Sequence, residues 1–268
     1  MDKTIIKKLH VIEKENNIRI LFACESGSRS WGYSSQNSDY DIRLLYTHPM
    51  EWYLSIENQK DVMEWSVNQL DITGWDLKKA LQLCLKSNPS LYEWLFSGVV
   101  YLEEASTVQT LRELVNTYYT LSTLFYHYFK MSKRNYLHFQ QTNHKSIKSR
   151  LSILRPLLTC LFLMEKQQLP PVSIHSLVKE TDPDINEIIL SLIHKKKNSD
   201  HNLDESMDQK LTNFINQSFV QLEKYKPLSK QKKASFQAEL DFLFLRTLKN
   251  EKEARSFINR NNDYNRLD

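Results

Sequence analysis

One short stretch near the start of the chain holds residues that could bind phosphate. The stretch is ESGSRSWGYSSQNSDYDIR, and it carries the pair Gly27-Ser28 directly after an apolar run. A glycine lets the backbone approach a ligand closely, and successive backbone N–H groups at such a turn can bind an anion. The Ser28 hydroxyl and the Arg29 guanidinium can add contacts to phosphate oxygens. These three residues therefore predict an anion-binding turn.

Two carboxylates follow the turn within the same stretch. Asp39 and Asp41 stand two residues apart at the start of the apolar run YDIRLLYTH. In a strand they project from one face, about 7 Å apart. Such a pair is costly without a cation, and Mg²⁺ binds a few carboxylates together with substrate phosphate oxygens. Either motif alone is commonly an ordinary loop or a solvated strand end, but together they predict a site for a nucleoside triphosphate carried on Mg²⁺.

Composition limits the classes of protein to which the chain could belong. The chain has 268 residues, of which 41% are hydrophobic and 11% aromatic, so it can bury a sizeable core in one large domain or two. The net charge is only +4, so an anion site must come from local clustering rather than from a uniformly basic coat. The three cysteines form no zinc or disulfide pattern, and neither a signal peptide nor a run of about 18 apolar residues is present. A cytoplasmic protein without a membrane partner is expected, and its oligomeric state is left open.

Periodicity predicts strands and helices before about residue 104 and helices alone after it. The first part reads as a helix over 3–16, strands over 18–26 and 40–48, a strand or hairpin over 61–72, and helices after Gly74 and Pro89. The second part reads as helices over 106–127, 128–142, 145–167, 173–180, 184–198, 204–225 and 230–249. The expected fold is α+β, with a catalytic domain over 1–103 built on a mixed sheet and an all-helical domain over 104–268.

The order strand, Gly-Ser, about ten residues, Asp-x-Asp and strand resembles the DNA polymerase β nucleotidyltransferase superfamily. The strings ESGSRSWGY, SDYDIR, LDITGWDLKKAL, SKRNY and LRPLL are similar to its bacterial and phage predicted-nucleotidyltransferase branch, which includes RNA-repair-associated members. The resemblance covers most of residues 20–172 and is strongest at the N-terminal motifs. It implies a polymerase β-like catalytic domain and a helical domain that closes the nucleotide cleft.

The superfamily uses a third carboxylate on a neighbouring strand. Asp71, in QLDI, is the candidate because it follows a β-like run, with an N-cap or turn residue as the alternative. Asp76 competes with it but fits better in the first turn of a helix. With Asp39, Asp41 and Asp71 as ligands of two Mg²⁺ ions, or of Mn²⁺, the resemblance implies a two-metal transfer of a nucleoside monophosphate with release of pyrophosphate.

Basic residues of the helical part are expected to reach the same nucleotide. They are Lys133 in MSKRNY, and Lys148 and Arg155 in KSIKSRLSILRPLL. Lys148 and Arg155 are seven residues apart and share a helix face. The helical domain of related enzymes contacts the nucleotide, which makes these three candidate phosphate ligands; a solvated surface base is the alternative for each. The basic segment 194–201 is expected to be a helix end or loop, with an RNA-binding patch as its alternative.

The acceptor of the transferred nucleotide is open at this point. The resemblance favours an RNA end, and a protein or a small molecule are alternatives because the donor chemistry is identical. A non-catalytic protein that binds nucleotide or RNA on the same fold is a further alternative. All three candidate carboxylates are present, which favours an enzyme. The sequence does not identify the nucleoside triphosphate that serves as donor.

Overall fold

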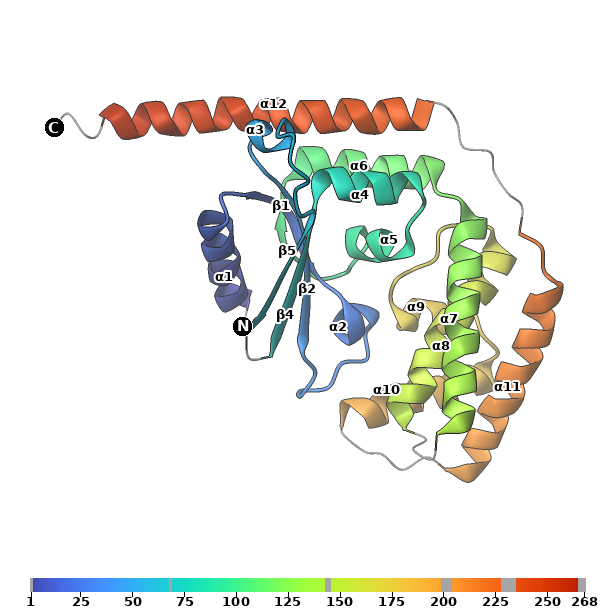
Figure 1. Cartoon of the computed structure of the whole chain (residues 1–268). Helices are drawn as coiled ribbons and strands as arrows, with labels where there is room; N and C mark the ends of the chain where they lie inside the picture. Colours follow the sequence, from blue (N-terminus) through green and yellow to red (C-terminus); the bar gives the residue numbers. More distant parts are fainter. Residues whose placement is uncertain (1, 68, 143–145, 199–203, 228–234, 265–268) are drawn as a thin grey trace.

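The chain folds around a mixed five-stranded sheet with a large group of helices beside it (Figure 1). The computed structural model describes residues 2–67, 69–142, 146–198, 204–227 and 235–264, with side chains except at residue 67 and over 250–264. This α+β architecture confirms the expected fold class. None of the described helices is long and apolar enough to cross a membrane.

The strands follow the order β3-β4-β2-β1-β5 across the sheet. Their bounds are β1 Arg19–Glu25, β2 Tyr40–Thr47, β3 Val62–Val67, β4 Leu70–Asp76 and β5 Val100–Glu103. β2 and β4 are parallel, and the other neighbouring pairs are antiparallel. The two strands that carry the predicted carboxylates are therefore adjacent and run in the same direction.

Helices cover both faces of the sheet. On one face, α1 (Asp2–Glu15) buries Ile5, Leu9 and Ile12, which recur at helical spacing, against the strands. On the other face lie α4 (Leu77–Leu85), α5 (Pro89–Leu95) and α6 (Ala105–Tyr118) (Figure 1). Consecutive residues of β1 are buried on opposite faces, which explains why this strand reads as a continuous apolar run.

The remaining helices lie mostly on one side of the sheet. They are α2 Gly27–Trp31, α3 Met50–Tyr53, α7 Leu121–Gln141, α8 Ile147–Lys166, α9 Ile174–Val178, α10 Pro183–Lys197, α11 Glu205–Lys224 and α12 Ser235–Tyr264. The last of them returns to pack on α4 and α6 (Figure 1). One hydrophobic cluster runs from β1 through the helices to α12. A domain boundary at residue 103 stays a prediction and coincides with the end of β5.

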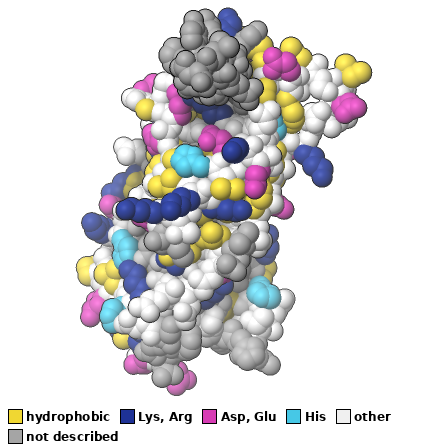
Figure 2. Space-filling model, turned by 90° about the vertical axis from the view of Figure 1, so that its left-hand side faces the viewer, with side chains coloured by type: hydrophobic (Ala, Val, Ile, Leu, Met, Phe, Trp, Pro, Cys, Tyr) yellow, Lys and Arg dark blue, Asp and Glu magenta, His cyan; other side chains and the backbone are white. Residues whose placement is uncertain are grey.

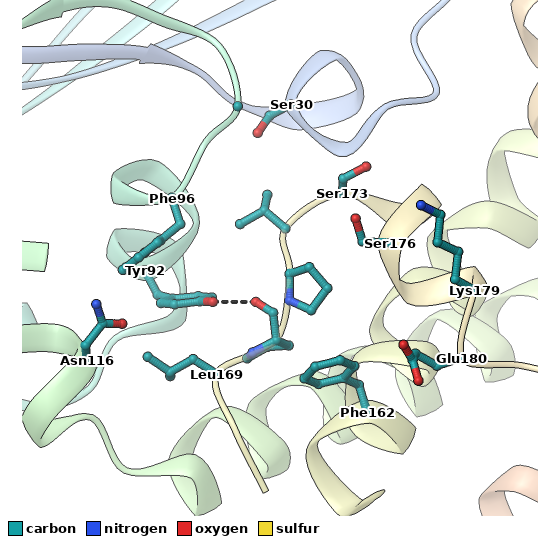
Figure 3. A pocket seen from close by; sticks show the side chains of 14 residues that line it. Ser30, Tyr92, Phe96, Asn116, Phe162, Leu169, Ser173, Ser176, Lys179 and Glu180 are labelled. Atoms are coloured by element: carbon teal, nitrogen blue, oxygen red, sulfur yellow. Dashed lines mark hydrogen bonds between the residues drawn. The ribbon is translucent and has the colours of Figure 1, made fainter. Parts of the chain in front are cut away.

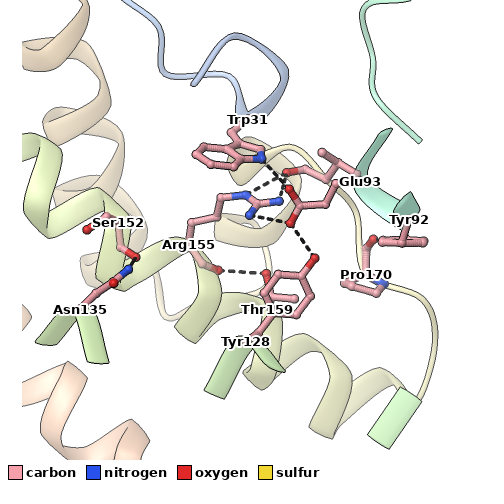
Figure 4. Close-up of polar contacts among 10 residues, drawn as sticks. Trp31, Tyr92, Glu93, Tyr128, Asn135, Ser152, Arg155, Thr159 and Pro170 are labelled. Atoms are coloured by element: carbon pink, nitrogen blue, oxygen red, sulfur yellow. Dashed lines mark hydrogen bonds and ion pairs between the residues drawn. The ribbon is translucent and has the colours of Figure 1, made fainter. Parts of the chain in front are cut away.

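Helices α7 and α8 lie side by side, and a proline helps to hold them together. Pro156 is inside α8, where it has no N–H for the carbonyl of Ser152. The Asn135 side chain of α7 donates a hydrogen bond of 2.9 Å to that carbonyl instead (Figure 4). The polar group released by the proline is thus satisfied by the neighbouring helix.

Several elements differ from the expectation, and two of them show the reason. The helix expected over 106–127 is divided at Tyr119 and Thr120, because the Thr120 backbone N–H donates to the Ser87 hydroxyl at 3.0 Å and the Tyr119 hydroxyl donates to the Asn88 carbonyl. Strand β5 was not expected; it is a short edge strand that pairs with β1. Tertiary contacts create both features, and local composition does not signal them.

Candidate active site

A cavity of about 680 Å³ opens where the sheet meets the helical part. Residues of the first half of the chain line one wall, including Ser26, Gly27, Ser28, Asp39 and Asp41. The helical part lines the other wall with Ser146 just before α8, with Ile147, Lys148 and Ser152 of α8, and with Lys196 of α10. The predicted anion-binding turn and the Asp-x-Asp pair thus face the same space.

Gly27 forms the turn between β1 and α2 and lies against Asp41. Its φ is +57°, a left-handed conformation that favours glycine. A Cβ atom at this position would come within 2.1 Å of the Asp41 Oδ2 atom. The Ser26 backbone N–H also donates to the Asp41 carbonyl at 2.7 Å. The position accepts only glycine without displacing the Asp41 carboxylate.

Asp71 lies directly beside Asp41 in the sheet. The two are paired in the register of the parallel strands β2 and β4, so their side chains share a face. The Arg43 Nη2 atom lies between them, 3.3 Å from the Asp41 Oδ1 and 3.2 Å from the Asp71 Oδ2. This is the placement that a shared cation site requires, although Asp71 is half exposed and is not among the described residues that line the cavity.

The charge around Asp41 suits a divalent cation. Partial burial raises the pKa of the Asp41 carboxyl above its ordinary value; the charges of Asp71 and Asp39 act in the same direction, and Arg43 opposes them. Carboxylates are oxygen ligands of the kind that Mg²⁺ prefers, so the residues fit this ion. Within the described part of the chain, no three His, Cys, Asp or Glu side chains form a ready metal-binding group. A metal-binding role for Asp39, Asp41 and Asp71 therefore stays a prediction.

Glu25 positions the backbone of the Asp-x-Asp pair. It is buried, and its Oε1 atom accepts a hydrogen bond of 2.8 Å from the Asp41 backbone N–H. The Tyr101 hydroxyl donates to its other oxygen at 2.5 Å. Burial raises the pKa of the Glu25 carboxyl, and both hydrogen bonds act against this shift. Glu25 thus ties the end of β1 to the start of β2.

Arg29 supports the loop before β2. Its guanidinium donates to the carbonyls of Ser38 at 2.6 Å and Asp39 at 3.1 Å, and it lies 3.7 Å from the centre of the Tyr40 ring. It is not among the described residues that line the cavity. Its contacts position Asp39, and a contact to phosphate stays a prediction without support from this geometry.

Lys148 lies in the cavity, as the sequence predicts, and Lys196 of α10 joins it there. The Lys196 ammonium donates to the Tyr33 carbonyl at 3.0 Å. Burial lowers the pKa of Lys196, and the charge of Lys148 contributes to the shift. The ammonium groups of Lys148 and Lys196 lie on the cavity wall opposite the carboxylates, and their positive charge favours the binding of an anion. The sequence assigned Lys196 to a helix end, which it is, but not to this cavity.

Arg155 does not face the cavity, contrary to the expectation. Its side chain is 4% exposed and its Nη1 atom lies 3.0 Å from the Glu93 Oε1 (Figure 4). The guanidinium also donates to the Val172 carbonyl and lies 4.5 Å from the centre of the Trp31 ring. Trp31 lines the cavity, and its indole N–H donates to the other Glu93 oxygen at 3.0 Å. Arg155 therefore supports the cavity wall through Glu93 and Trp31 without lining the cavity itself.

Replacement of Arg155 by alanine should lower the free energy of unfolding by about 3–5 kcal/mol, because it leaves the buried Glu93 charge without its partner. Urea denaturation measures this change. Lys133→Ala is a matched control that also removes one cation from an ion pair. Because Lys133 is exposed, it should change stability by no more than about 1 kcal/mol. Equal effects of the two variants would contradict the buried role of Arg155.

Lys133 lies away from the cavity. It is exposed on α7 and pairs with Glu223 of α11. Its surroundings include Lys130 and Arg134, on the same helix. Because Lys133 is not among the described residues that line the cavity, its expected contact to the nucleotide stays a prediction without support from this geometry.

Asp76 is not a rival for the third carboxylate. It ends β4 and caps α4, where its Oδ1 atom accepts from the Lys78 backbone N–H at 2.8 Å. The Tyr53 hydroxyl donates to its Oδ2 atom at 2.6 Å. Burial raises the pKa of Asp76 to about 6. These hydrogen bonds hold the Asp76 carboxyl in its role as the N-cap of α4.

A second hollow of about 640 Å³ lies between α5, the segment 169–173 and α9 (Figure 3). Tyr92, Phe96 and Phe162 line it, and the Tyr92 hydroxyl donates to the Pro170 carbonyl (Figure 3). None of the three candidate carboxylates reaches it. The candidate active site is therefore assigned to the cavity at Gly27 and Asp41.

The mixed sheet, with the glycine turn beside carboxylates on neighbouring strands, is the arrangement expected of a polymerase β-like nucleotidyltransferase domain. A family model described as "RlaP: RNA repair pathway DNA polymerase beta family" matches residues 1–246, and the chain belongs to this family. Family and fold together indicate a nucleotidyltransferase.

Two further proteins are similar to this chain. "Uncharacterized protein YcgL" from Bacillus subtilis (strain 168) is 35% identical over 251 residues, which cover 92% of this chain and 96% of the relative. The crystal structure of a nucleotidyltransferase-like protein from Exiguobacterium sibiricum 255-15 matches with 16% identity and a TM-score of 0.28 over 94% of this chain and 92% of that one. The second similarity is too low to carry an argument.

Proposed function

We propose that the protein is a metal-dependent nucleotidyltransferase that moves a nucleoside monophosphate from a nucleoside triphosphate to an acceptor hydroxyl at an RNA end. The observation that supports this most is the turn at Gly27, which lies against Asp41 while Asp41 is paired in register with Asp71. An anion-binding turn and a carboxylate pair are thus held together by the backbone of one sheet.

The cavity has binding groups for both ends of a nucleotide. The backbone at Gly27 and the Ser28 hydroxyl would contact the triphosphate from one wall, and Lys148 and Lys196 would contact it from the other. Trp31 lines the same space and is held by Glu93 and Arg155, which makes it a firm surface on which a base could stack.

Asp39, Asp41 and Asp71 would hold Mg²⁺, as two ions, or Mn²⁺ in its place. When bound, the metal neutralises phosphate charge and lowers the pKa of the attacking hydroxyl. Arg43 supplies the positive charge between Asp41 and Asp71 in the structure, and Glu25 keeps the backbone of Asp41 in place. The contribution of the protein is then positioning and charge stabilisation.

The acceptor is proposed to be RNA because the family is described as part of an RNA repair pathway. A protein or small-molecule acceptor would use the same donor site. Incubation with each labelled nucleoside triphosphate, Mg²⁺ and total RNA, followed by separate counting of label in RNA and in protein, tests the proposal. Label should enter RNA. Label in protein alone would overturn the RNA acceptor, and absence of label from RNA, protein and small molecules would overturn the activity.

Alanine at Lys148 or at Lys196 should weaken nucleotide binding. A charge-assisted hydrogen bond contributes about 1.5–3 kcal/mol, so the Kd for a nucleoside triphosphate should rise about tenfold to a hundredfold in each variant. Isothermal titration measures this change. Lys179→Ala is the matched control, because Lys179 lines the other hollow and should leave the Kd unchanged. A wild-type Kd in both test variants would remove α8 and α10 from the proposed triphosphate site.

A further inference from the structure

The exposed side of α7 differs in charge from the other long surface helices. Residues 121–141, LSTLFYHYFKMSKRNYLHFQQ, include no Asp and no Glu. The exposed residues that matter here are Tyr126, Lys130, Lys133, Arg134, Leu137 and His138, and we call them the α7 face. By comparison, α1 mixes four lysines with three acids.

The pattern of α7 explains why these residues point outward. Leu124, Phe125, Tyr128, Tyr136 and Phe139 are buried in the helical core, where α7 packs on α8. The Tyr136 hydroxyl also donates to the Asn216 side chain of α11. The other side of the helix is left for solvent. There, side chains four residues apart lie one above the other, in a row through positions 126, 130, 134 and 138.

The cations of the α7 face are available to a ligand. Lys133 pairs with Glu223, and this exposed pair contributes little to stability. Neither Lys130 nor Arg134 is paired with a carboxylate among the residues that the structure describes. They are four residues apart, or about 6 Å along the helix axis. Such a row of cations can follow the successive phosphates of a strand.

Exposed apolar surface interrupts the cations of the α7 face. Tyr126 is 48% exposed and Leu137 is 52% exposed. Grooves that bind single-stranded nucleic acid combine cations for the backbone with aromatic rings on which bases stack. An acidic peptide would use the charge but has no bases to stack on Tyr126, so the combination favours a polynucleotide.

Helix α7 adjoins the candidate active site through two contacts, both made by residues outside the α7 face. Asn135 of α7 donates to the carbonyl of Ser152, which lines the cavity. The Tyr128 hydroxyl donates at 2.6 Å to Glu93, which holds the wall residue Trp31. In the antiparallel pair of helices, the end of α7 also lies beside the start of α8, where Lys148 enters the cavity (Figure 1). A strand that follows the row from position 126 toward position 138 can therefore approach the site at this end of α7.

We propose that the α7 face binds the RNA acceptor as a single strand, with Lys130 and Arg134 contacting its phosphates and Tyr126 stacking on a base. The proposal rests on the proposed function for the identity of the acceptor. It assigns to α7 a role separate from nucleotide binding, since the residues that line the cavity come from other elements.

Fluorescence anisotropy with a short, labelled single-stranded RNA tests this surface. The double variant Lys130→Ala, Arg134→Ala should weaken RNA binding tenfold or more. Each phosphate contact to a single strand contributes about 0.7 to the slope of log affinity against log salt, so this slope should fall by about 1.4. The affinity for a nucleoside triphosphate should stay at the wild-type value, which also shows that the variant is folded.

The matched control removes the same charge elsewhere. Lys3→Ala, Lys14→Ala changes two exposed lysines of α1, which covers the sheet on the side away from α7 (Figure 1). Figure 2 shows that side of the molecule, where Lys and Arg side chains form a band across the surface. This control should keep wild-type RNA affinity. Equal weakening by both double variants would mean that only net charge matters and would overturn the α7 assignment.

Two further arms separate the possible failures. Unlabelled poly-glutamate should displace the RNA far less well than unlabelled RNA does; equal displacement would overturn the nucleic-acid assignment. Nucleotidyl transfer by the wild-type protein is measured in parallel. RNA binding that depends on α7, found together with absence of nucleotidyl transfer in the wild type, would overturn the proposed function while leaving this surface supported.

Discussion

Asp41→Asn should lower the rate of nucleotidyl transfer by about 10²–10³-fold or more while the fold stays intact. Asparagine keeps the shape of the side chain but removes the charge that would hold the metal, and loss of one group that stabilises charge in the transition state has effects of this size. The Asp41 backbone contacts to Ser26 and Glu25 do not involve the carboxyl group and should be retained. Single-turnover kinetics with labelled nucleotide measure the change.

Asp61→Asn provides the control for this substitution. Asp61 pairs with Lys79 at 3.1 Å, is about half exposed and does not line the candidate active site. The same chemical change there should leave the rate at the wild-type value. Thermal unfolding checks that both variants are folded. A folded Asp41→Asn protein with near wild-type turnover would contradict the role given to this carboxylate.

Gly27→Ala should have the second largest effect. The new Cβ atom would come within 2.1 Å of the Asp41 Oδ2, so the turn or the carboxylate must move. A left-handed backbone also costs a residue with a Cβ about 1–2 kcal/mol. Because misplacement by about 1 Å can cost 10²-fold in rate, a loss of about 10²-fold in transfer is expected. Steady-state kinetics should show this loss with a modest change in thermal stability.

Gly98→Ala is a closely matched control, because a Cβ atom there meets nothing within 4 Å. The backbone of Gly98 is also outside the left-handed region. This variant should keep wild-type activity and stability. If both glycine variants lose activity equally, the close approach of Gly27 to Asp41 does not matter for the reaction.

The parts of the site that lie close together in the sequence were predictable from it. Gly27 and Ser28 begin α2 just after β1, and Asp39 and Asp41 lie at the start of β2, so residue spacing alone brings them to the same end of the sheet. Asp71 required a further inference, that its strand lies beside that of Asp41, and the register of β2 and β4 is the one this inference needs.

Other parts of the site depend on tertiary contacts and could not be predicted in the same way. The spacing of Lys148 and Arg155 shows that they share a helix face, but not that Glu93 and Val172 cover that face at Arg155. Lys196 reaches the cavity only because α10 packs beside α8.

Arg43 is a different case, because a signal for it was present in the sequence. It continues the alternation of Asp39 and Asp41 along β2, so its side chain had to lie on their face. A charged residue on the same strand face as the expected ligands can therefore indicate a site, even when its charge is opposite to theirs.

The central claim is transfer of the α-phosphoryl group with its nucleoside, and the position of the label tests it most directly. The wild-type protein is incubated with RNA, Mg²⁺ and a nucleoside triphosphate labelled at either the α- or the γ-phosphate. The α-label should enter the RNA, the γ-label should be released as an equal amount of pyrophosphate, and Asp41→Asn should lower both by about 10²–10³-fold or more. Transfer of γ-label to RNA, or release of γ-label as orthophosphate without incorporation of α-label, would contradict it.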